Sequence, residues 1–199
     1  TLKTHSLHWL LKSLPILLLA QLAFASLQAQ QKVQTIYIER IIALPAEQVW
    51  AIVGEDYGAI AHSHPRIVSS QYINGSLKAG EGAERVCNFN EKGTQYLRER
   101  IMSYSPESMT LTNQVFQAGK FPVDPELTKA VYKVEDLGNG TCKLSFDFQY
   151  RTKPAMMGSL MKGRFTSLLE DYFIAVEHHA KTGEKVNKEN FKAIKKQYT

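Results

Sequence analysis

The feature that most constrains this fold is one long amphipathic helix that follows a series of short strands. From Pro154 to about Ala180, apolar side chains recur every three or four residues, which is the spacing of a helix with one buried face. A helix of that length extends roughly 40 Å, enough to cross a whole sheet. The predicted buried stripe contains Met157, Leu160, Met161, Phe165, Leu168, Leu169, Tyr172, Phe173 and Val176.

Six segments before this helix have the composition of strands, and turn signals such as Asn74-Gly75 and Gly138-Asn139-Gly140 separate them. In the last segment apolar and polar side chains alternate, so one face of the sheet is apolar and the other meets water. That pattern is typical of an antiparallel sheet. The six predicted strands cover residues 67–73, 83–90, 94–103, 109–116, 127–135 and 141–151.

A seventh strand is predicted ahead of these, over residues 31–44, and two short helices follow it. Pro45 suits the start of the first helix, which runs from Ala46 to Val53, because proline is favoured in the first helical turn. The second helix, near residues 56–61, ends before His64-Pro65, since the residue before a proline avoids helical geometry. The order of elements therefore predicts an α+β fold.

The first 29 residues have the pattern of a secretory signal peptide. Lys3 and Lys12 accompany an apolar run over residues 14–25, and small residues offer cleavage sites at Ala23-Phe24-Ala25 and over 27–29. The run is shorter than the roughly 20 apolar residues that a membrane span needs, although an uncleaved N-terminal anchor is the alternative. We therefore expect a signal peptide over residues 1–29, a domain over 30–183 and a basic tail over 184–199, in a periplasmic or secreted protein.

The positive net charge of +5 belongs to the two ends of the chain. The tail from Lys181 to Thr199 holds six lysines and two glutamates, and the signal segment holds Lys3 and Lys12. The body between them carries 16 basic and 17 acidic side chains. A nucleic-acid-binding domain would carry its basic patch on the fold itself. We therefore expect no nucleic-acid partner, and no membrane span after signal cleavage.

Several short motifs occur in a characteristic order. They are Leu44-Pro45-Ala46-Glu47-Gln48-Val49-Trp50, His64-Pro65, Gly82-Ala83 followed by Arg85, Glu99-Arg100-Ile101, Phe121-Pro122-Val123 and Gly138-Asn139-Gly140-Thr141. With the order of elements, they resemble the START-like, Bet v 1-like superfamily, also called SRPBCC or polyketide cyclase/dehydrase proteins. The resemblance covers about residues 32–183. It implies a helix-grip fold, in which a seven-stranded antiparallel sheet, with two short helices after its first strand, wraps around the long C-terminal helix and leaves a cavity. Ser63 departs from the pattern, because the family often has tryptophan there.

The hairpin around residues 91–93 determines which side chains face each other across two strands. A three-residue loop with Gly93 in the left-handed conformation places Arg85 opposite Glu99. A two-residue loop would instead place Arg85 opposite Arg98, a like-charge pair that destabilises a sheet. We therefore predict an inward-facing Arg85–Glu99 pair. Its role is a structural salt bridge, a polar anchor for a ligand head group, or acid/base catalysis.

Side chains on the apolar faces of the strands and helix are candidates to line the cavity. Methionines near the helix start, together with Gly158 and Gly163, indicate a segment that yields. We expect ligands to enter between this segment and the loops around His64 and residues 119–122; ordinary core packing is the alternative. The cavity candidates are Arg85, Cys87, Phe89, Leu97, Glu99, Asn113, Tyr132, Phe146, Met157, Met161, Phe165 and His64.

Both cysteines are expected to be free thiols. Cys87 and Cys142 point inward from different strands, but the family's strand order puts four strand spacings between them. That is roughly 19 Å along the sheet, whereas a disulfide needs Cα atoms within about 7 Å.

These observations favour an exported protein that binds a hydrophobic small molecule or lipid in the cavity. One alternative is a polyketide cyclase- or dehydratase-like enzyme that uses the same cavity, with Glu99, Arg85, Tyr132 or His64 as acid or base. Another is a protein-interaction domain with a filled core. Several convergent groups with shifted pKa values would favour the enzyme.

Metal binding and cofactor binding are not expected. Adjacent His178 and His179 on a helix do not share a face, and His62 and His64 have no obvious third ligand, which catalytic zinc requires. The lone Gly80-Glu81-Gly82 lies between strands and contains an acid, so it is poorly suited to phosphate and is predicted to be a turn.

Overall fold

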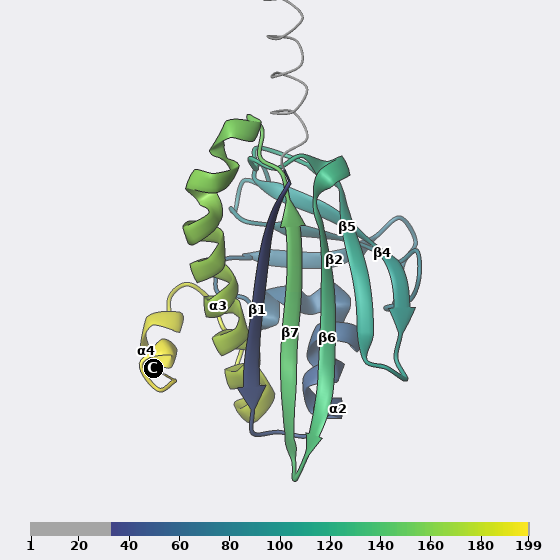
Figure 1. The fold of residues 1–199 in the computed structure, drawn as a ribbon, viewed down its shortest axis with the longest axis vertical. Coiled ribbons are helices and arrows are strands. Elements are labelled where there is room, and N and C mark those ends of the chain that lie inside the picture. Colours follow the sequence, from purple (N-terminus) through teal and green to yellow (C-terminus); the bar gives the residue numbers. More distant parts are fainter. Residues whose placement is uncertain (1–32, 199) are drawn as a thin grey trace, which may run out of the picture. The chain divides into compact units, whose positions relative to one another are not determined.

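One antiparallel sheet of seven strands forms the frame of the domain. The computed structural model describes residues 33–198, so the predicted signal peptide over residues 1–29 lies outside the described part of the chain. The strands are β1 (Gln34–Ile42), β2 (Ser69–Ile73), β3 (Glu84–Asn88), β4 (Tyr96–Ser105), β5 (Thr110–Ala118), β6 (Lys129–Gly138) and β7 (Thr141–Tyr150). Their order in the sheet is β1-β7-β6-β5-β4-β3-β2, so the first strand lies beside the last (Figure 1).

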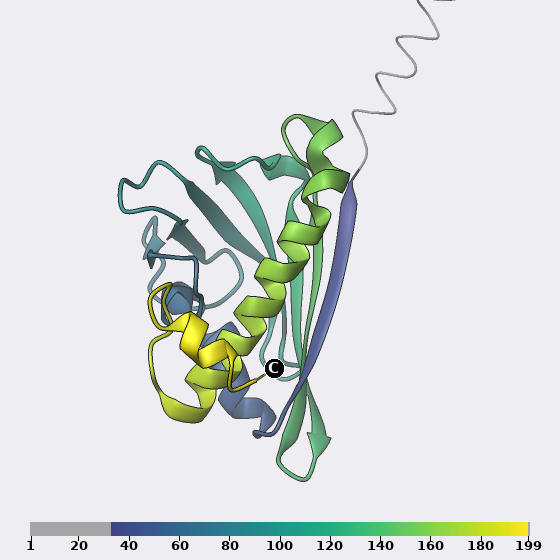
Figure 2. The same cartoon turned by 90° about the vertical axis from the view of Figure 1, so that its left-hand side faces the viewer.

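Short helices connect β1 to β2, and one long helix follows β7. The connection contains α2 (Ala46–Trp50), a π-helical turn (Ala51–Glu55) and a 3₁₀ helix (Tyr57–His62). After single 3₁₀ turns at Pro125–Leu127 and Ala155–Met157, the long helix α3 runs from Gly158 to Thr182. It ends at Gly183, whose φ of 71° places it in the left-handed region that glycine adopts without steric cost. Figure 2 shows α3 crossing in front of the curved sheet.

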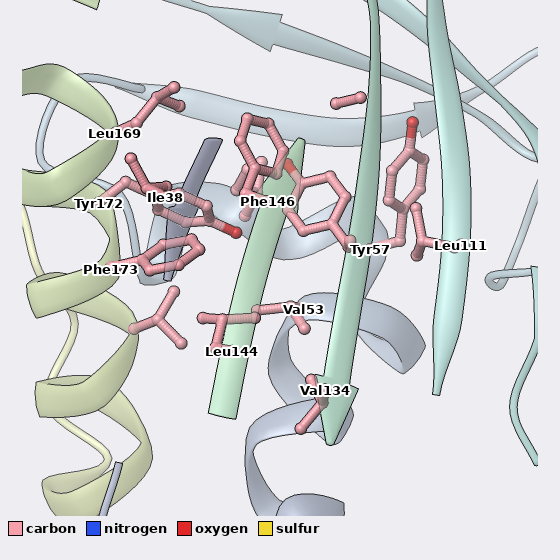
Figure 3. Packing of buried hydrophobic residues seen from close by; sticks show 14 of the residues in the cluster. Ile38, Val53, Tyr57, Leu111, Val134, Leu144, Phe146, Leu169, Tyr172 and Phe173 are labelled. Atoms are coloured by element: carbon pink, nitrogen blue, oxygen red, sulfur yellow. The ribbon is translucent and has the colours of Figure 1, made fainter. Parts of the chain in front are cut away.

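The core lies between the sheet and the inner face of α3. Figure 3 shows Leu169, Tyr172 and Phe173 of the helix pointing toward Leu144 and Phe146 of β7. All five side chains are buried. The alternation predicted for β7 is therefore present, because its inward residues are the apolar ones. The antiparallel helix-grip fold is confirmed.

The start of the predicted stripe is exposed rather than buried. Leu160, in the first turn of α3, is 81% exposed, and Met157, in the 3₁₀ turn before α3, is 37% exposed. Leu160 precedes Phe165 by five residues, which turns it by roughly 140° around the helix axis and away from the sheet. The spacing of three and four residues therefore identifies the buried face from Met161 onward, but the prediction that Leu160 is buried was wrong.

The predicted hairpin register is also confirmed. Gly93 has a φ of 62°, and its N–H donates to the carbonyl of Asn90 at 3.0 Å. Arg85 consequently lies opposite Glu99, and Cys87 opposite Leu97.

Both cysteines are buried and free, as expected. Cys87 lies on β3 and Cys142 on β7. Three strands separate β3 from β7 in the sheet, so the two thiols cannot approach each other.

The C-terminal segment packs against the outer side of α3 rather than extending into solvent. Its short helix α4 (Phe191–Lys195) buries Phe191 and Ile194 against Ile174 and Ala175. Val186 forms an isolated bridge with Ser63, and its N–H donates to the carbonyl of His62 at 2.8 Å. The basic tail expected from the sequence therefore contains a short surface helix. Within residues 33–198, no helix has both the length and the apolarity needed to cross a membrane.

Candidate functional site

A buried ion pair forms the deep end of the candidate site. Arg85 Nε donates to Glu99 Oε2 at 2.7 Å, and the two side chains are 3% and 14% exposed. Arg85 Nη1 also donates to the carbonyl of Tyr57 at 2.6 Å, and the guanidinium carbon lies 3.8 Å from the centre of the Tyr57 ring. Burial by itself would lower the pKa of Arg85, but Glu99, Tyr57, Cys87 and Tyr132 together outweigh it, so the pKa lies well above the ordinary value.

Further donors occupy the Glu99 carboxylate. Asn113 Nδ2 donates to Glu99 Oε1 at 3.0 Å, and the thiol of Cys87 lies 3.6 Å from Oε2. Asn113 reaches the pair from β5, and its side chain is 2% exposed. A buried charge is tolerated when such partners satisfy it. The deep end therefore carries charge, but that charge is already compensated within the protein.

An inner cavity of about 90 Å³ adjoins this ion pair. Its wall is mainly aromatic and aliphatic, and it lies between the sheet and α3. The rings of Tyr132 and Phe146 meet edge to face at 4.5 Å in this wall. The lining residues are Ile60, His64, Ile67, Arg85, Cys87, Phe89, Leu97, Glu99, Phe121, Tyr132, Phe146, Phe148, Phe165, Leu168, Leu169 and Tyr172.

His64 is held in one neutral form at the edge of this cavity. The backbone N–H of Arg66 donates to His64 Nδ1 at 3.0 Å, so the neutral ring carries its proton on Nε2. The ring stacks on Tyr172 with 4.9 Å between centroids. Burial, with smaller contributions from Arg85 and Arg66, lowers the pKa of His64 to about 3. His64 is therefore uncharged at neutral pH.

The tyrosines around the cavity are also uncharged at neutral pH. Burial raises the pKa of Tyr132 to about 12. Burial, together with the neighbouring Tyr132, places the pKa of Tyr172 well above its ordinary value. These hydroxyls can donate hydrogen bonds, but neither has a pKa lowered toward neutral pH.

A larger outer cleft opens next to the inner cavity. Its volume is about 610 Å³, and it lies between α3, the β3–β4 hairpin and the loop that follows β5. Cleft and cavity share Phe89, Phe121, Phe165 and Leu168 in their linings. The Phe89 and Phe121 rings are 4.7 Å apart. These four side chains, three phenylalanines and one leucine, lie between the two spaces and are called the aromatic gate below. The other lining residues of the cleft are Arg66, Gln95, Lys120, Pro122, Met161, Arg164, Ser167 and Asp171.

The structure brings most of the predicted cavity residues together. Asn113 does not line either space but supports Glu99 from behind, and Met161 lines the outer cleft. Met157 lines neither space, because it lies in the 3₁₀ turn before α3 and is exposed. The candidates that line the inner cavity are His64, Arg85, Cys87, Phe89, Leu97, Glu99, Tyr132, Phe146 and Phe165.

Several lining residues were missed, and their sequence signals differ. Tyr172 and Leu168 belong to the predicted helix stripe, and Phe148 is in phase with Phe146 on β7, so periodicity could have identified them. Ile60 lies in the 3₁₀ helix and Ile67 in the loop that follows. Ile67 was predicted to begin a strand over residues 67–73, but β2 begins at Ser69, so neither residue lies on an element whose period fixes its direction.

The four histidines within residues 33–198 are not gathered into one cluster. The rings of His62 and His179 are 6.4 Å apart, and His178 Nε2 contacts Glu184. Among residues 33–198, no group of three or more His, Cys, Asp or Glu side chains is arranged to hold a metal ion.

Comparison with known proteins gives a family and a fold. Residues 33–172 match the model of a family described as polyketide cyclase / dehydrase and lipid transport. Similar solved structures include a protein from Thermobifida fusca, which is 23% identical with a TM-score of 0.60, over 73% of this chain and 92% of that chain. Norcoclaurine synthase from Thalictrum flavum is 15% identical with a TM-score of 0.54, over 73% and 92%. Ara h 8.0201 is 18% identical with a TM-score of 0.57, over 75% and 98%. At these identities the likeness shows the fold alone. No curated protein is significantly similar in sequence.

Proposed function

The chain belongs to the polyketide cyclase/dehydrase and lipid transport family of the Bet v 1-like superfamily, and we propose that it binds a hydrophobic small molecule or lipid between its sheet and α3. The observation that carries this proposal is that the mainly apolar inner cavity adjoins the outer cleft and shares four lining side chains with it. The two spaces together are called the passage below. Small-molecule sites are usually mainly apolar, with a few polar groups that orient the ligand.

The two volumes indicate how such a ligand would lie. The inner cavity of about 90 Å³ is smaller than the roughly 300 Å³ of typical ligand sites, whereas the cleft of about 610 Å³ is within their range. A ring or a short length of chain fills the inner cavity, and the rest of the ligand occupies the cleft. The aromatic gate then packs around the middle of the ligand.

Binding is favoured over acid/base catalysis by the state of the titratable groups. General acids and bases work best with a pKa near the working pH. The pKa of His64 is lowered to about 3 and that of Tyr132 is raised to about 12. Glu99 is occupied by Arg85, Asn113 and Cys87. The four candidates for acid/base catalysis, Glu99, Arg85, Tyr132 and His64, are therefore better suited to binding and stability than to proton transfer.

The location of the protein is part of the same proposal. The signal-peptide pattern over residues 1–29 supports binding outside the cytoplasm. Expression of the full chain in a Gram-negative host, fractionation and N-terminal sequencing test this. A mature N-terminus near residue 26 or 30 in the periplasmic fraction is expected, and an uncleaved cytoplasmic chain would contradict it.

A matched pair of substitutions tests the binding site. Leu97 lines the inner cavity, and Leu97→Trp should fill it; Met102 lies on the same strand but is 48% exposed. Titration with the neutral dye Nile red should show at least tenfold weaker binding by Leu97→Trp and unchanged binding by Met102→Trp. Native mass spectrometry of the wild-type protein should also detect a co-purified ligand. Wild-type protein that binds neither dye nor ligand would disprove the proposed function.

A further inference from the structure

The rim of the outer cleft carries three cations that have no carboxylate partner. Arg66, Lys120 and Arg164 all line the cleft and are exposed. No ion pair engages any of them within residues 33–198. The one acid in the lining, Asp171, is already paired with Lys195 at 2.6 Å. The rim is therefore an uncompensated positive site.

This cluster does not reflect a general excess of positive charge. Residues 33–180 carry 15 basic and 17 acidic side chains, so the body of the domain is slightly acidic. The three cations come from separate segments: Arg66 precedes β2, Lys120 follows β5, and Arg164 lies on α3. The fold thus gathers three cations from distant parts of the sequence around one opening.

The deep end of the passage offers no equivalent position for a charged group. Arg85 is already bonded to Glu99 and to the carbonyl of Tyr57, and Glu99 also accepts from Asn113. A charge brought there would lose its hydration and would compete with an existing pair, at a cost of several kcal/mol. A ligand with one charged end therefore leaves that end at the rim, in contact with water.

We propose that the ligand is an amphipathic anion, whose carboxylate, sulfonate or phosphate group lies among Arg66, Lys120 and Arg164. Its apolar body passes the aromatic gate into the inner cavity. Arginine suits this role because its guanidinium can donate two parallel hydrogen bonds to an oxyanion. This inference rests on the proposed function and adds the class and the orientation of the ligand.

The probes are decanoate and decanol, which share one alkyl chain length and differ in the charge of the head group. Each competes with Nile red bound to the wild-type protein. Exposed charge contacts are individually weak and are screened by salt. We expect tighter binding of decanoate than of decanol at 50 mM salt, and a smaller difference at 500 mM salt.

The variants remove the same amount of charge at two places. Arg66→Gln, Lys120→Gln and Arg164→Gln are combined in one protein, and Lys78→Gln, Lys129→Gln and Lys188→Gln, all exposed positions outside the cleft, in the control. We expect the rim variant to bind decanoate about 10- to 100-fold more weakly, with decanol affinity within twofold of wild type. The control should leave both affinities within twofold.

Each other outcome has a distinct meaning. If decanoate and decanol compete equally and the rim variant changes neither, the anion site is wrong although binding stands. If inorganic phosphate alone displaces Nile red at micromolar concentration, the site holds a small anion rather than an amphiphile, and the proposal fails. If Nile red and both alkyl probes fail to bind the wild-type protein, the proposed function itself is wrong.

Discussion

The two ends of the passage differ in how their charged side chains are paired. At the deep end, Arg85 is buried and the Glu99 side chain is 14% exposed, and each has several partners. At the rim, Arg66 and Arg164 are exposed and form no ion pair with any carboxylate of residues 33–198. Compensated charge holds elements together, whereas uncompensated charge is available to a ligand. Under the proposed function, the deep end serves stability and the rim serves recognition.

The largest expected effect comes from removing one partner at the deep end. Glu99→Ala leaves the Arg85 guanidinium buried without its carboxylate, which should lower the free energy of unfolding by about 3–5 kcal/mol. Urea denaturation measures this. The rim counterpart Arg164→Ala should change stability by less than about 0.5 kcal/mol. A loss below 1 kcal/mol for Glu99→Ala would mean that water reaches the pair, and the contrast between the ends would disappear.

An acid-sensitive loss of stability should follow from His64. The pKa of His64 is about 3 in the folded protein and about 6.5 when unfolded. The unfolded chain therefore takes up a proton first as the pH falls, so the contribution of His64 is present above pH 6.5 and is lost below it. We expect about 2 kcal/mol less stability at pH 5 than at pH 7.5 from this residue. Comparison with His64→Gln isolates it, and parallel pH profiles would refute it.

A substitution at the rim should affect ligands more than stability. Met161 lines the outer cleft, and Met161→Trp should narrow it at a cost below about 2 kcal/mol. Binding of Nile red and of decanoate should weaken severalfold. The neighbouring Leu160→Trp is the control, because Leu160 is 81% exposed and lies outside the cleft. Equal affinities for the two variants would place the entrance elsewhere.

The smallest expected effect concerns the helix next to the rim. A Cβ at Gly163 would meet nothing within 4 Å, so Gly163→Ala should stabilise the protein by about 0.5–1 kcal/mol. At Gly158 a Cβ would lie 3.1 Å from Gln34 Cγ, and Gly158→Ala should gain less. Thermal unfolding compares them. If the flexibility of this segment matters for entry, Gly163→Ala should also slow association of Nile red in stopped-flow measurements.

Regular periodicity accounts for the parts of the fold that the sequence predicted well. Alternation on β7 identified its inward face, and the position of Gly93 determined the register that pairs Arg85 with Glu99. Both signals are local. Side chains of a strand point alternately to its two faces, and the turn needs a left-handed backbone conformation at the single residue Gly93. The error at Leu160 arose because a spacing of three from Met157 suggested burial. The position of Leu160 around the helix axis, roughly 140° from Phe165, places it on the exposed face.

The site was less predictable because it depends on how separate segments meet. Tyr57 closes over the guanidinium of Arg85 from a 3₁₀ helix that has no clear apolar period. Phe121 reaches the aromatic gate from a loop. The size of the inner cavity follows from the packing of many side chains at once, and no single pattern in the sequence encodes a void. Most of the candidates that were found lie on regular elements, whereas Ile60, Ile67 and Phe121, on irregular segments, were missed, although His64, also on an irregular segment, was found.

Because β1 pairs with β7, this part of the sheet can form only after β7 has been synthesised. β1 leaves the ribosome early, but its neighbour in the sheet ends at Tyr150, more than 100 residues later. The bridge of Ser63 forms later still, because its partner is Val186. Until β7 is made, both edges of β1 are unpaired, whereas only one remains unpaired in the finished sheet. Unpaired edges invite association with other chains. We therefore expect released chains that end near residue 140 to depend on chaperones, and released chains that include β7 and α3 to depend on them much less.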